Sequence, residues 1–401
     1  MKDKSQAHDA ANGGARTKAL RFVLLIGIVS LFGDFTYEGA RSVTGPYLES
    51  LNASAAVVGV VAGLGELIGY GLRLASGRLA DVSGRYWPMA IFGYMVQLLA
   101  VPALALAGSW PQAAALILLE RVGKAIRNPP RDVMLSHAGA QMGGYGWAFG
   151  LREALDQFGA MVGPLVVAAV LAGGGSYREA FAVLVVPALI TLALVGVARL
   201  LYPAPHEMEP HAPSARGDGL PRVFWVYLFG AALVAAGFAD WSLIAFHLAR
   251  TDAVSTQSIA IFYSVAMAVS GAGSLAMGRL FDRFGFAVLI GLTIVSSFFA
   301  PFAFFGGFGM ALVGACLWGL GMGVHESIIP AAVAPMVAPQ RRAYAFGLFA
   351  AGYGLFWFLG SAAIGFLYDR SIAAAVVFCL VAQFAALPPF IWVWRRQRAA
   401  S

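Results

Sequence analysis

Long apolar runs follow one another along almost the whole chain, and this feature restricts its fold more than any other. A helix of about 20 apolar residues crosses the hydrocarbon core of a bilayer, which is about 30 Å thick. Hydrophobic residues make up 60% of the chain and charged residues 12%, and the mean hydropathy is +0.75. Soluble domains are roughly half apolar and a quarter charged. The sequence therefore predicts an integral membrane protein built from helices.

Twelve such runs are expected, six on each side of the polar, proline-rich stretch 202–220, which predicts an interdomain linker. The expected domains are a polar, disordered tail at 1–20, helical bundles at 21–201 and 221–394, and a second tail at 395–401. Ligand-type side chains in the linker have no scaffold to fix them, so exposed linker chemistry is favoured over a metal site. They are His206, Glu207, Glu209 and His211. The expected spans are 21–48, 55–77, 87–108, 111–130, 147–172, 177–201, 221–249, 256–279, 285–305, 308–335, 342–366 and 371–394.

The basic residues that flank the spans predict the orientation. With the N-terminus inside, most of them fall on the cytoplasmic side, and only Arg178, Arg250 and Arg370 fall outside. We expect a multi-pass protein of the cytoplasmic (inner) membrane with both termini in the cytoplasm. This distribution accounts for the net charge of +7 without a nucleic acid partner. Cys316 and Cys379 stand in separate spans without ligand-type spacing, so they are interpreted as ordinary buried thiols.

A short charged turn occurs twice. The stretch GRLADVSGR at 77–85 returns about half a chain later as GRLFDRFG at 278–285, and each copy lies between two apolar runs. Such an internal repeat predicts two halves of similar fold.

The first copy of this turn, with the pattern G-x-x-x-D-x-x-G-R, resembles the loop between helices 2 and 3 of the major facilitator superfamily. The second copy is similar to the equivalent loop between helices 8 and 9. The resemblance implies the major facilitator fold, in which 12 transmembrane helices form two pseudo-symmetric six-helix bundles around a central cavity. It also implies a cytoplasmic gate, latched when the aspartate lies against a helix N-terminus of the other half. The gate residues would be Gly77, Asp81, Gly84, Arg85, Gly278, Asp282 and Gly285.

Charged residues inside the first two spans are the main candidates for function. Asp34, Glu38 and Arg41 are spaced i, i+4 and i+7, so they share one helical face and must avoid lipid. Glu66 and Arg73 share a face of the second span in the same way. Membrane charges are expensive and functional by default. The alternative is that these groups only pair with one another to hold the helices together.

The fourth span is the most heavily charged stretch. Arg121 and Lys124 are helical neighbours, and the sequence around them resembles the helix 4 motif of the family, whose buried arginine is implicated in proton transfer. Because arginine does not release a proton, its role would be to set the charge of a nearby carboxylate or to hold an anion. Arg127, Arg131 and Asp132 surround two prolines and are expected to be solvated charges at the cytoplasmic mouth.

The fifth span begins with Arg152, Glu153 and Asp156. The glycines and proline that follow resemble the helix 5 motif of proton-coupled exporters, which would pack closely at the glycines and bend at the proline. These residues are Gly159, Gly163 and Pro164. The sequences of spans four and five also resemble those of a bacterial branch of the family that contains nickel-resistance and multidrug-type exporters.

The second half keeps few of these charges. Aromatic residues of this half either line a cavity or pack the core: Trp241, Phe246, Tyr263, Trp318, Tyr353, Phe356 and Trp357. The residues expected around a substrate cavity are Tyr37, Arg41, Glu66, Asp240, His247, His325, Glu326 and Trp357.

The resulting hypothesis is a monomeric secondary transporter that exports a small organic compound by proton antiport. No nucleotide-binding motif appears, so an ion gradient is the expected energy source, and no cofactor or enzymatic constellation is predicted. The proton-coupling candidates are Asp34, Glu38, Glu153 and Asp156, with Arg121, Lys124 and Arg152 as their charged neighbours. The alternative is export of a divalent metal ion such as nickel, cobalt or iron. Its ligands would be Asp34, Glu38, Asp240, His247, His325 and Glu326. A non-transporting membrane sensor is a remote third hypothesis.

Overall fold

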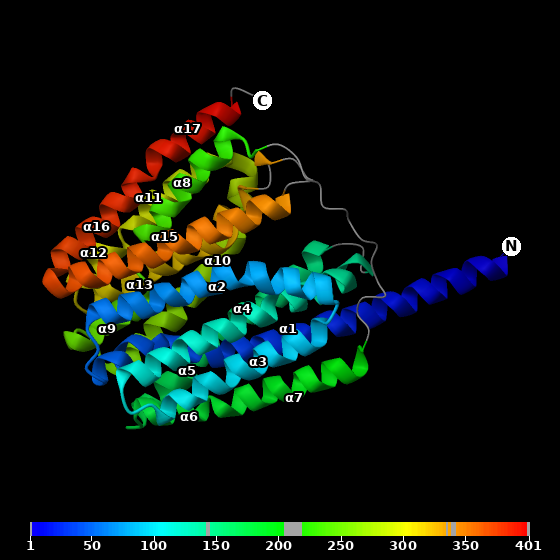
Figure 1. The fold of residues 1–401 in the computed structure, drawn as a ribbon, viewed down its shortest axis with the longest axis horizontal. Helices are drawn as coiled ribbons and strands as arrows, with labels where there is room; N and C mark the ends of the chain where they lie inside the picture. Colours follow the sequence, from blue (N-terminus) through cyan, green and yellow to red (C-terminus); the bar gives the residue numbers. More distant parts are fainter. Residues whose placement is uncertain (1, 142–144, 204–218, 334–335, 338–341, 399–401) are drawn as a thin grey trace.

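The computed structural model describes residues 2–141, 145–203, 219–333, 336–337 and 342–398, and the regular elements among them are all helices. Two bundles lie side by side (Figure 1). Eleven helical stretches are long and apolar enough to cross a membrane. A twelfth crossing, the charge-rich α4, packs within the first bundle beside α3 and α2. The predicted all-α membrane fold with twelve helices is confirmed.

The first bundle contains six crossings, of which the sixth is divided into α6 and α7 at Leu184. Its elements are α1 (Lys2–Ser50), α2 (Ala55–Ser83), α3 (Tyr86–Ala103), α4 (Trp110–Gln141), α5 (Tyr145–Ala172), α6 (Tyr177–Val183) and α7 (Val185–Leu201).

In the second bundle, several crossings are broken into shorter helices. Its elements are α8 (Arg222–Ala236), α9 (Trp241–Arg250), α10 (Thr256–Phe284), α11 (Phe286–Ser297), α12 (Phe299–Phe305), α13 (Phe308–Gly323), a π-helical turn (Val324–Ile328), α14 (Ile329–Ala331), α15 (Arg342–Arg370), α16 (Ile372–Ala385) and α17 (Leu387–Arg398).

The seventh crossing departs from the expected continuous helix. It stops at Ala236 and restarts at Trp241, because Asp240 is the N-cap of α9 and its carboxylate accepts a hydrogen bond from the Ser242 N–H at 2.9 Å. The break therefore places an acidic side chain in the middle of the membrane span.

The tenth crossing is also irregular. Between α13 and α14 the chain forms a π-helical turn that carries His325 and Glu326. Pro330 follows it and has no N–H with which to continue the α-helical pattern. Such π-helical turns are frequent at functional sites.

The N-terminal stretch was expected to be a disordered tail, and this prediction is wrong. The helix α1 begins at Lys2 and extends well beyond the bundle (Figure 1). Five alanines lie in this stretch, and alanine has the highest helix propensity. A membrane helix that already exists also removes the cost of nucleation.

The repeated turn ends a helix at a glycine with positive φ in both halves, although ψ differs, at 8° for Gly84 and −138° for Gly285. Gly84 ends α2 with φ 61°, and Gly285 ends α10 with φ 59°. A left-handed conformation of this kind favours glycine. The side chains of Asp81 and Asp282 lie outside the described part of the structure.

Close helix contacts hold each bundle together at equivalent glycines. A Cβ atom on Gly159 or Gly163 of α5 would lie 2.1 or 2.2 Å from the Leu31 or Phe35 carbonyl oxygen of α1. In the second half, a Cβ atom on Gly360 of α15 would lie 2.1 Å from the Ala236 carbonyl oxygen of α8. The predicted close approach at helix 5 therefore occurs, and α5 carries Pro164 one residue later.

The two bundles meet tightly at the end opposite the termini. A Cβ atom on Gly45 of α1 would lie 1.9 Å from the Ser242 carbonyl oxygen of α9, and one on Gly59 of α2 would lie 2.3 Å from the Ser361 carbonyl oxygen of α15. At the same end, the Asp369 carboxylate of α15 accepts hydrogen bonds from the backbone N–H groups of Ala55 and Ala56 at 3.0 and 2.9 Å. We call this the closed end. Toward the end with the termini the bundles diverge (Figure 1).

Candidate functional site

A cavity of about 590 Å³ lies between the bundles. It is lined by parts of α1, α2, α4 and α5 on one side and by α10, α13 and the π-helical turn on the other. Its volume falls within the range of small-molecule sites, roughly 300–1,000 Å³. The charged residues around it are Asp34, Glu38, Arg41, Glu66, Arg73, Arg121, Lys124, Arg127, Arg131, Asp132, Arg152, Glu153, Asp156 and Glu326.

The charged face of α1 points into this cavity, together with Tyr37. The Tyr263 hydroxyl of α10 donates a hydrogen bond to the Glu38 carboxylate at 2.5 Å. Arg41 forms an ion pair of 3.1 Å with Asp240 at the start of α9. Both contacts join the first bundle to the second, so α1 carries the main polar link between the halves.

The remaining charges near Arg41 extend the network within the first bundle. Glu66 of α2 lies 3.0 Å from Arg121 and 3.5 Å from Arg41, and Arg121 also lies 3.6 Å from Glu120. All four side chains are buried. Because an isolated buried charge is costly, their mutual pairing is what allows them to remain inside the membrane span.

The ring of Tyr37 collects three cations. The Arg41 and Arg121 guanidinium carbons lie 5.9 and 5.0 Å from its centre, and the Lys124 ammonium lies 3.7 Å from it. The attraction of a cation to an aromatic face is about 0.5–2 kcal/mol. Tyr37 thus holds the cavity end of Lys124 in place.

We define these residues as the barrier network: Glu38, Arg41, Glu66, Arg121, Asp240 and Tyr263, with Tyr37. Beyond the barrier network, toward the closed end, lies a space of only about 30 Å³ lined by Thr44, Leu48 and Val58 among others. One water molecule needs about 10–15 Å³, so this space is too small for an organic compound. The polar cavity therefore ends at the barrier network.

The charges after the middle of α4 correct a prediction. Arg127 and Arg131, expected to be solvated at the mouth, are 1% and 5% exposed. Arg127 donates hydrogen bonds to Gln97, to the Tyr94 hydroxyl at 3.1 Å and to Asp34 at 3.4 Å. The fourth span was expected to end at residue 130, whereas α4 continues through Pro129 and Pro130 to Gln141. These arginines are therefore buried within the bundle rather than solvated.

The charges of α5 form a compact cluster on the same side of the cavity as those of α1 and α4. Arg152 pairs with Asp156 one turn later and with Glu153 next to it. Gln157 donates a hydrogen bond to Glu153 at 3.3 Å. The three charged residues singled out in the sequence thus line one cavity with those of α1 and α4.

In the second half, His325 and Glu326 line the cavity, and three other expected residues do not. His325 is bonded to the Tyr353 hydroxyl. Asp240 lies behind Arg41 in the barrier network. His247 is corrected, since its ring is bonded to the Tyr368 hydroxyl at 2.8 Å and packs on Phe304, away from the cavity.

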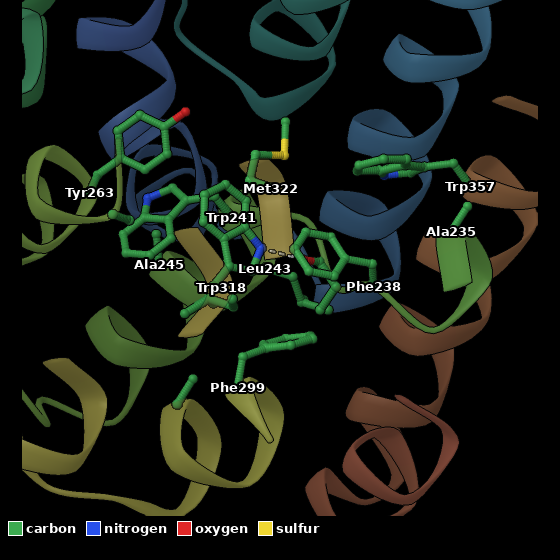
Figure 2. Packing of buried hydrophobic residues seen from close by; sticks show 14 of the residues in the cluster. Ala235, Phe238, Trp241, Leu243, Ala245, Tyr263, Phe299, Trp318, Met322 and Trp357 are labelled. Atoms are coloured by element: carbon green, nitrogen blue, oxygen red, sulfur yellow. Dashed lines mark hydrogen bonds between the residues drawn. The ribbon is translucent and has the colours of Figure 1, made fainter. Parts of the chain in front are cut away.

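Trp357 is also corrected. It is 1% exposed and packs its ring on Phe238 and His325. Phe238, Trp241 and Trp318 lie near one another (Figure 2). The ring centre of Trp318 is 5.6 Å from that of Phe238 and 5.4 Å from that of Trp241. Trp241 and Trp318 satisfy their indole N–H groups with the Ser42 and Ala239 carbonyl oxygens. The aromatic set is mainly packing, because burial of large rings stabilises the bundle most.

A side chamber of about 350 Å³ adjoins the cavity between α2 and α15. The two spaces share Tyr70, Arg73, His325 and Pro330. The rest of the side chamber is lined by Leu74, Phe346, Gly347, Phe349, Ala350 and Tyr353. Of the aromatic residues that the sequence placed either in a cavity or in the core, Tyr353 lines this chamber.

Several residues that line or support the site were not predicted, among them Tyr70, Tyr94, Gln97 and Asp369. Tyr94 and Gln97 carry polar groups on α3 one turn apart, and a glutamine in an apolar span was the signal for a buried partner. Asp369 at the closed end is preceded by Tyr368, and their polarity at the end of an apolar run was the available signal.

Metal ligation finds little support in the geometry. Within the described ranges, no three His, Cys, Asp or Glu side chains gather as a metal ion would require. The proposed ligands are instead distributed among other partners, as Asp240 with Arg41 and His247 with Tyr368 illustrate. The linker histidines at 206 and 211 lie outside the described residues, and both cysteines are free thiols.

The predicted gate residues lie at and around the ends of α2 and α10, at the end with the termini. Arg85 is exposed, and a Cβ atom on Gly77 would have ordinary contact with Pro129 of α4 at 3.6 Å. Space around Gly278 and Gly285 is open. With the bundles apart at this end, the expected latch between halves remains a prediction.

Two six-helix bundles around a polar cavity that is shut at one end define a membrane transporter of the alternating-access type. The model of the Major Facilitator Superfamily matches residues 23–324. The chain belongs to this family and is a secondary transporter.

Comparison with individual proteins agrees with this assignment. An uncharacterized protein of Mycobacterium tuberculosis is 43% identical over 378 residues, which cover 92% of each chain. An uncharacterized MFS-type transporter of Methanocaldococcus jannaschii is 23% identical over 87% of this chain and 89% of its own. The crystal structure of a variant of the nucleoside transporter NupG superposes with a TM-score of 0.75 at 13% identity, covering 92% of this chain and all of that one. At this identity the likeness to the crystal structure concerns the fold alone.

Proposed function

We propose that the protein exports a small organic compound across the cytoplasmic membrane by proton antiport, as a monomer with both termini in the cytoplasm. The observation that carries the proposal is the barrier network between a cavity of about 590 Å³ and a space of about 30 Å³. The excess of basic residues at the end with the termini supports a cytoplasmic location of that end. The cavity then faces the cytoplasm in this conformation.

Two contacts of the barrier network must break before the halves rock. These are the Arg41–Asp240 ion pair and the hydrogen bond from Tyr263 to Glu38. When both are made, the closed end stays shut. A cargo or a proton that weakens them favours the opposite conformation, since a ligand shifts an equilibrium by its differential affinity for the two states.

Glu38 is the proposed proton carrier among the four carboxylates singled out from the sequence. Asp34 is held by Arg127, and both Glu153 and Asp156 are held by Arg152, all within the first bundle. Glu38 instead bonds across to the second bundle and lies 3.9 Å from Arg41. Gain of a proton there would remove its attraction to Arg41 and thereby connect proton binding to the movement of the halves.

Export is favoured by the geometry of helix 5, whose glycines press on α1 and whose motif resembles that of proton-coupled exporters. The charged neighbours Arg121, Lys124 and Arg152 would maintain the ionised carboxylates between proton transfers. We expect the cytoplasmic latch of Asp81 and Asp282 to form only after the cavity end closes.

The experiment uses the purified protein in liposomes. With an acidic lumen, antiport predicts accumulation of a transported organic compound inside, because protons leaving the lumen drive cargo in. Accumulation with an alkaline lumen instead would indicate symport. Growth with organic toxicants against nickel, cobalt and iron, in cells with and without the gene, tests the cargo class. Protection against the metals alone would contradict the proposal.

A further inference from the structure

Two cations of the cavity make no ion pair with a carboxylate of the described residues. Five other arginines of the site are each in an ion pair: Arg41, Arg121, Arg127, Arg131 and Arg152. In contrast, no carboxylate of the described residues lies within 4.0 Å of Arg73 or Lys124, although both line the cavity. Each lies over an aromatic ring: the Arg73 guanidinium carbon is 5.7 Å from the ring centre of Tyr70, and the Lys124 ammonium is 3.7 Å from that of Tyr37. Arg73 is exposed in the cavity. Its guanidinium is therefore free to form a charge-assisted hydrogen bond with an anionic ligand.

Most carboxylates of the cavity already have a partner. Its carboxylates are engaged by arginine or by Tyr263, and Glu326 is the one for which the described residues supply neither an ion pair nor a hydrogen bond. Glu326 belongs to the second bundle, across the cavity from α2 and α4. A cargo with one anionic group at Arg73 supplies the ion pair that this arginine lacks, whereas a second anionic group near Glu326 would be repelled.

Arg73 lies where the cavity and the side chamber join. Besides Arg73, the side chamber is lined by aromatic and apolar groups, and His325 is already bonded to Tyr353. An apolar cavity of about 150 Å³ is enough to bind benzene. A side chamber of about 350 Å³ thus accepts a larger ring system, and a charged group attached to it would meet Arg73 at the junction.

We propose that the cargo is an amphipathic organic monoanion, with its apolar ring in the side chamber between α2 and α15 and its anionic group on Arg73. This inference rests on the proposed function and specifies the cargo of the same site. Lys124 supplies the second positive charge, beside Tyr37 and therefore next to the barrier network. The anionic group has a cation to move to as the cargo approaches the barrier.

The binding test uses three probes with the same ring and different charge: naphthalenesulfonate, naphthylmethyl-trimethylammonium and naphthalenemethanol. Each is titrated into the full-length protein in detergent by calorimetry. We expect the sulfonate to bind at least about tenfold more tightly than the other two, which corresponds to about 1.4 kcal/mol. Equal or tighter binding of the ammonium probe would overturn the inference.

Variants locate the site. Arg73→Gln should weaken sulfonate binding at least about tenfold, and Arg73→Lys should restore part of it, because a cation without the planar fork still attracts the anion. Ala350→Phe should weaken binding by filling the side chamber while leaving every charge in place. Arg78→Gln, the same change at an exposed arginine on the same helix, is the control and should bind as the wild type does. Unchanged sulfonate binding in both Arg73→Gln and Ala350→Phe would refute the assignment.

Transport distinguishes this inference from the proposed function. If a pH gradient drives the ammonium probe and not the sulfonate, proton-coupled transport stands and the monoanion assignment fails. If the sulfonate binds in an Arg73-dependent manner and no pH gradient moves it, the monoanion assignment is supported and proton coupling fails.

Discussion

The closed end of the transporter depends on Asp369, and replacing it tests how the halves are held. Its carboxylate accepts two backbone hydrogen bonds from the first turn of α2, at Ala55 and Ala56, from the opposite bundle. The change Asp369→Asn removes the negative charge at a helix N-terminus and leaves one good acceptor. The lost charge contributes about 0.3–1 kcal/mol and the lost hydrogen bond about 0.5–1.5 kcal/mol.

Together these losses should weaken the closed end by about 1–2 kcal/mol, which changes the ratio of its closed to open forms about 5- to 30-fold. The assay is a distance distribution between spin labels at Ser50 and Ser255, which lie at this end of different bundles, in a background of Cys316→Ser and Cys379→Ala. We expect the longer distance to become more populated in Asp369→Asn.

The matched control is Asp252→Asn. Asp252 is an exposed acid at the same end, and its φ of 48° is one that asparagine tolerates well. A distribution in Asp369→Asn that equals that of the control would refute the role of Asp369 in holding the two bundles together.

Two further predictions concern the first bundle, and thermal unfolding in detergent checks both. Gly163→Ala should lower the melting temperature, because overpacking against α1 costs about 1–3 kcal/mol, whereas Gly196→Ala, in open space on α7, should not; equal melting temperatures would contradict the α1–α5 contact. Arg127→Gln should cost about 3–5 kcal/mol, because Asp34 loses its buried partner, while the same change at the exposed Arg279 should leave stability unchanged. A stable Arg127→Gln protein would show that the buried network is not structural.

Helical spacing allowed a large part of the site to be predicted. Asp34, Glu38 and Arg41 recur with helical spacing in a span too apolar to expose them to lipid, so their common face had to point inward. The structure places that face in the cavity. The same reasoning worked for Glu66 and Arg73 on α2. These are local arguments, since the spacing within one helix and the cost of a charge in lipid are enough to make them.

Other features depend on partners far away in the sequence. Arg127 is buried because it binds Asp34 of α1 and Gln97 of α3. Neither partner can be inferred from the sequence of α4 alone. The fourth span was expected to end at residue 130, but neighbouring helices allow α4 to continue. His247 and Trp357 turn away from the cavity because Tyr368 and Phe238 occupy positions that only the assembled bundle defines.

The helix breaks were the least predictable part of the fold. Hydropathy treats 221–249 as one span, because the residues around the break are as apolar as the rest. The break follows from Asp240, which caps α9 and pairs with Arg41 of the other bundle. A side chain that satisfies two partners at once is visible only when both bundles are assembled.

The most direct test of proton-coupled alternating access is transport by Glu38→Gln in liposomes. Glutamine keeps the shape of the side chain and an acceptor for Tyr263, and it cannot carry a proton. Using naphthalenesulfonate as cargo and Glu49→Gln, at the far end of α1, as the control, we measure exchange at equal pH and accumulation driven by an acidic lumen. The account predicts that Glu38→Gln exchanges cargo at close to the control rate and accumulates none. Full accumulation by Glu38→Gln would contradict it.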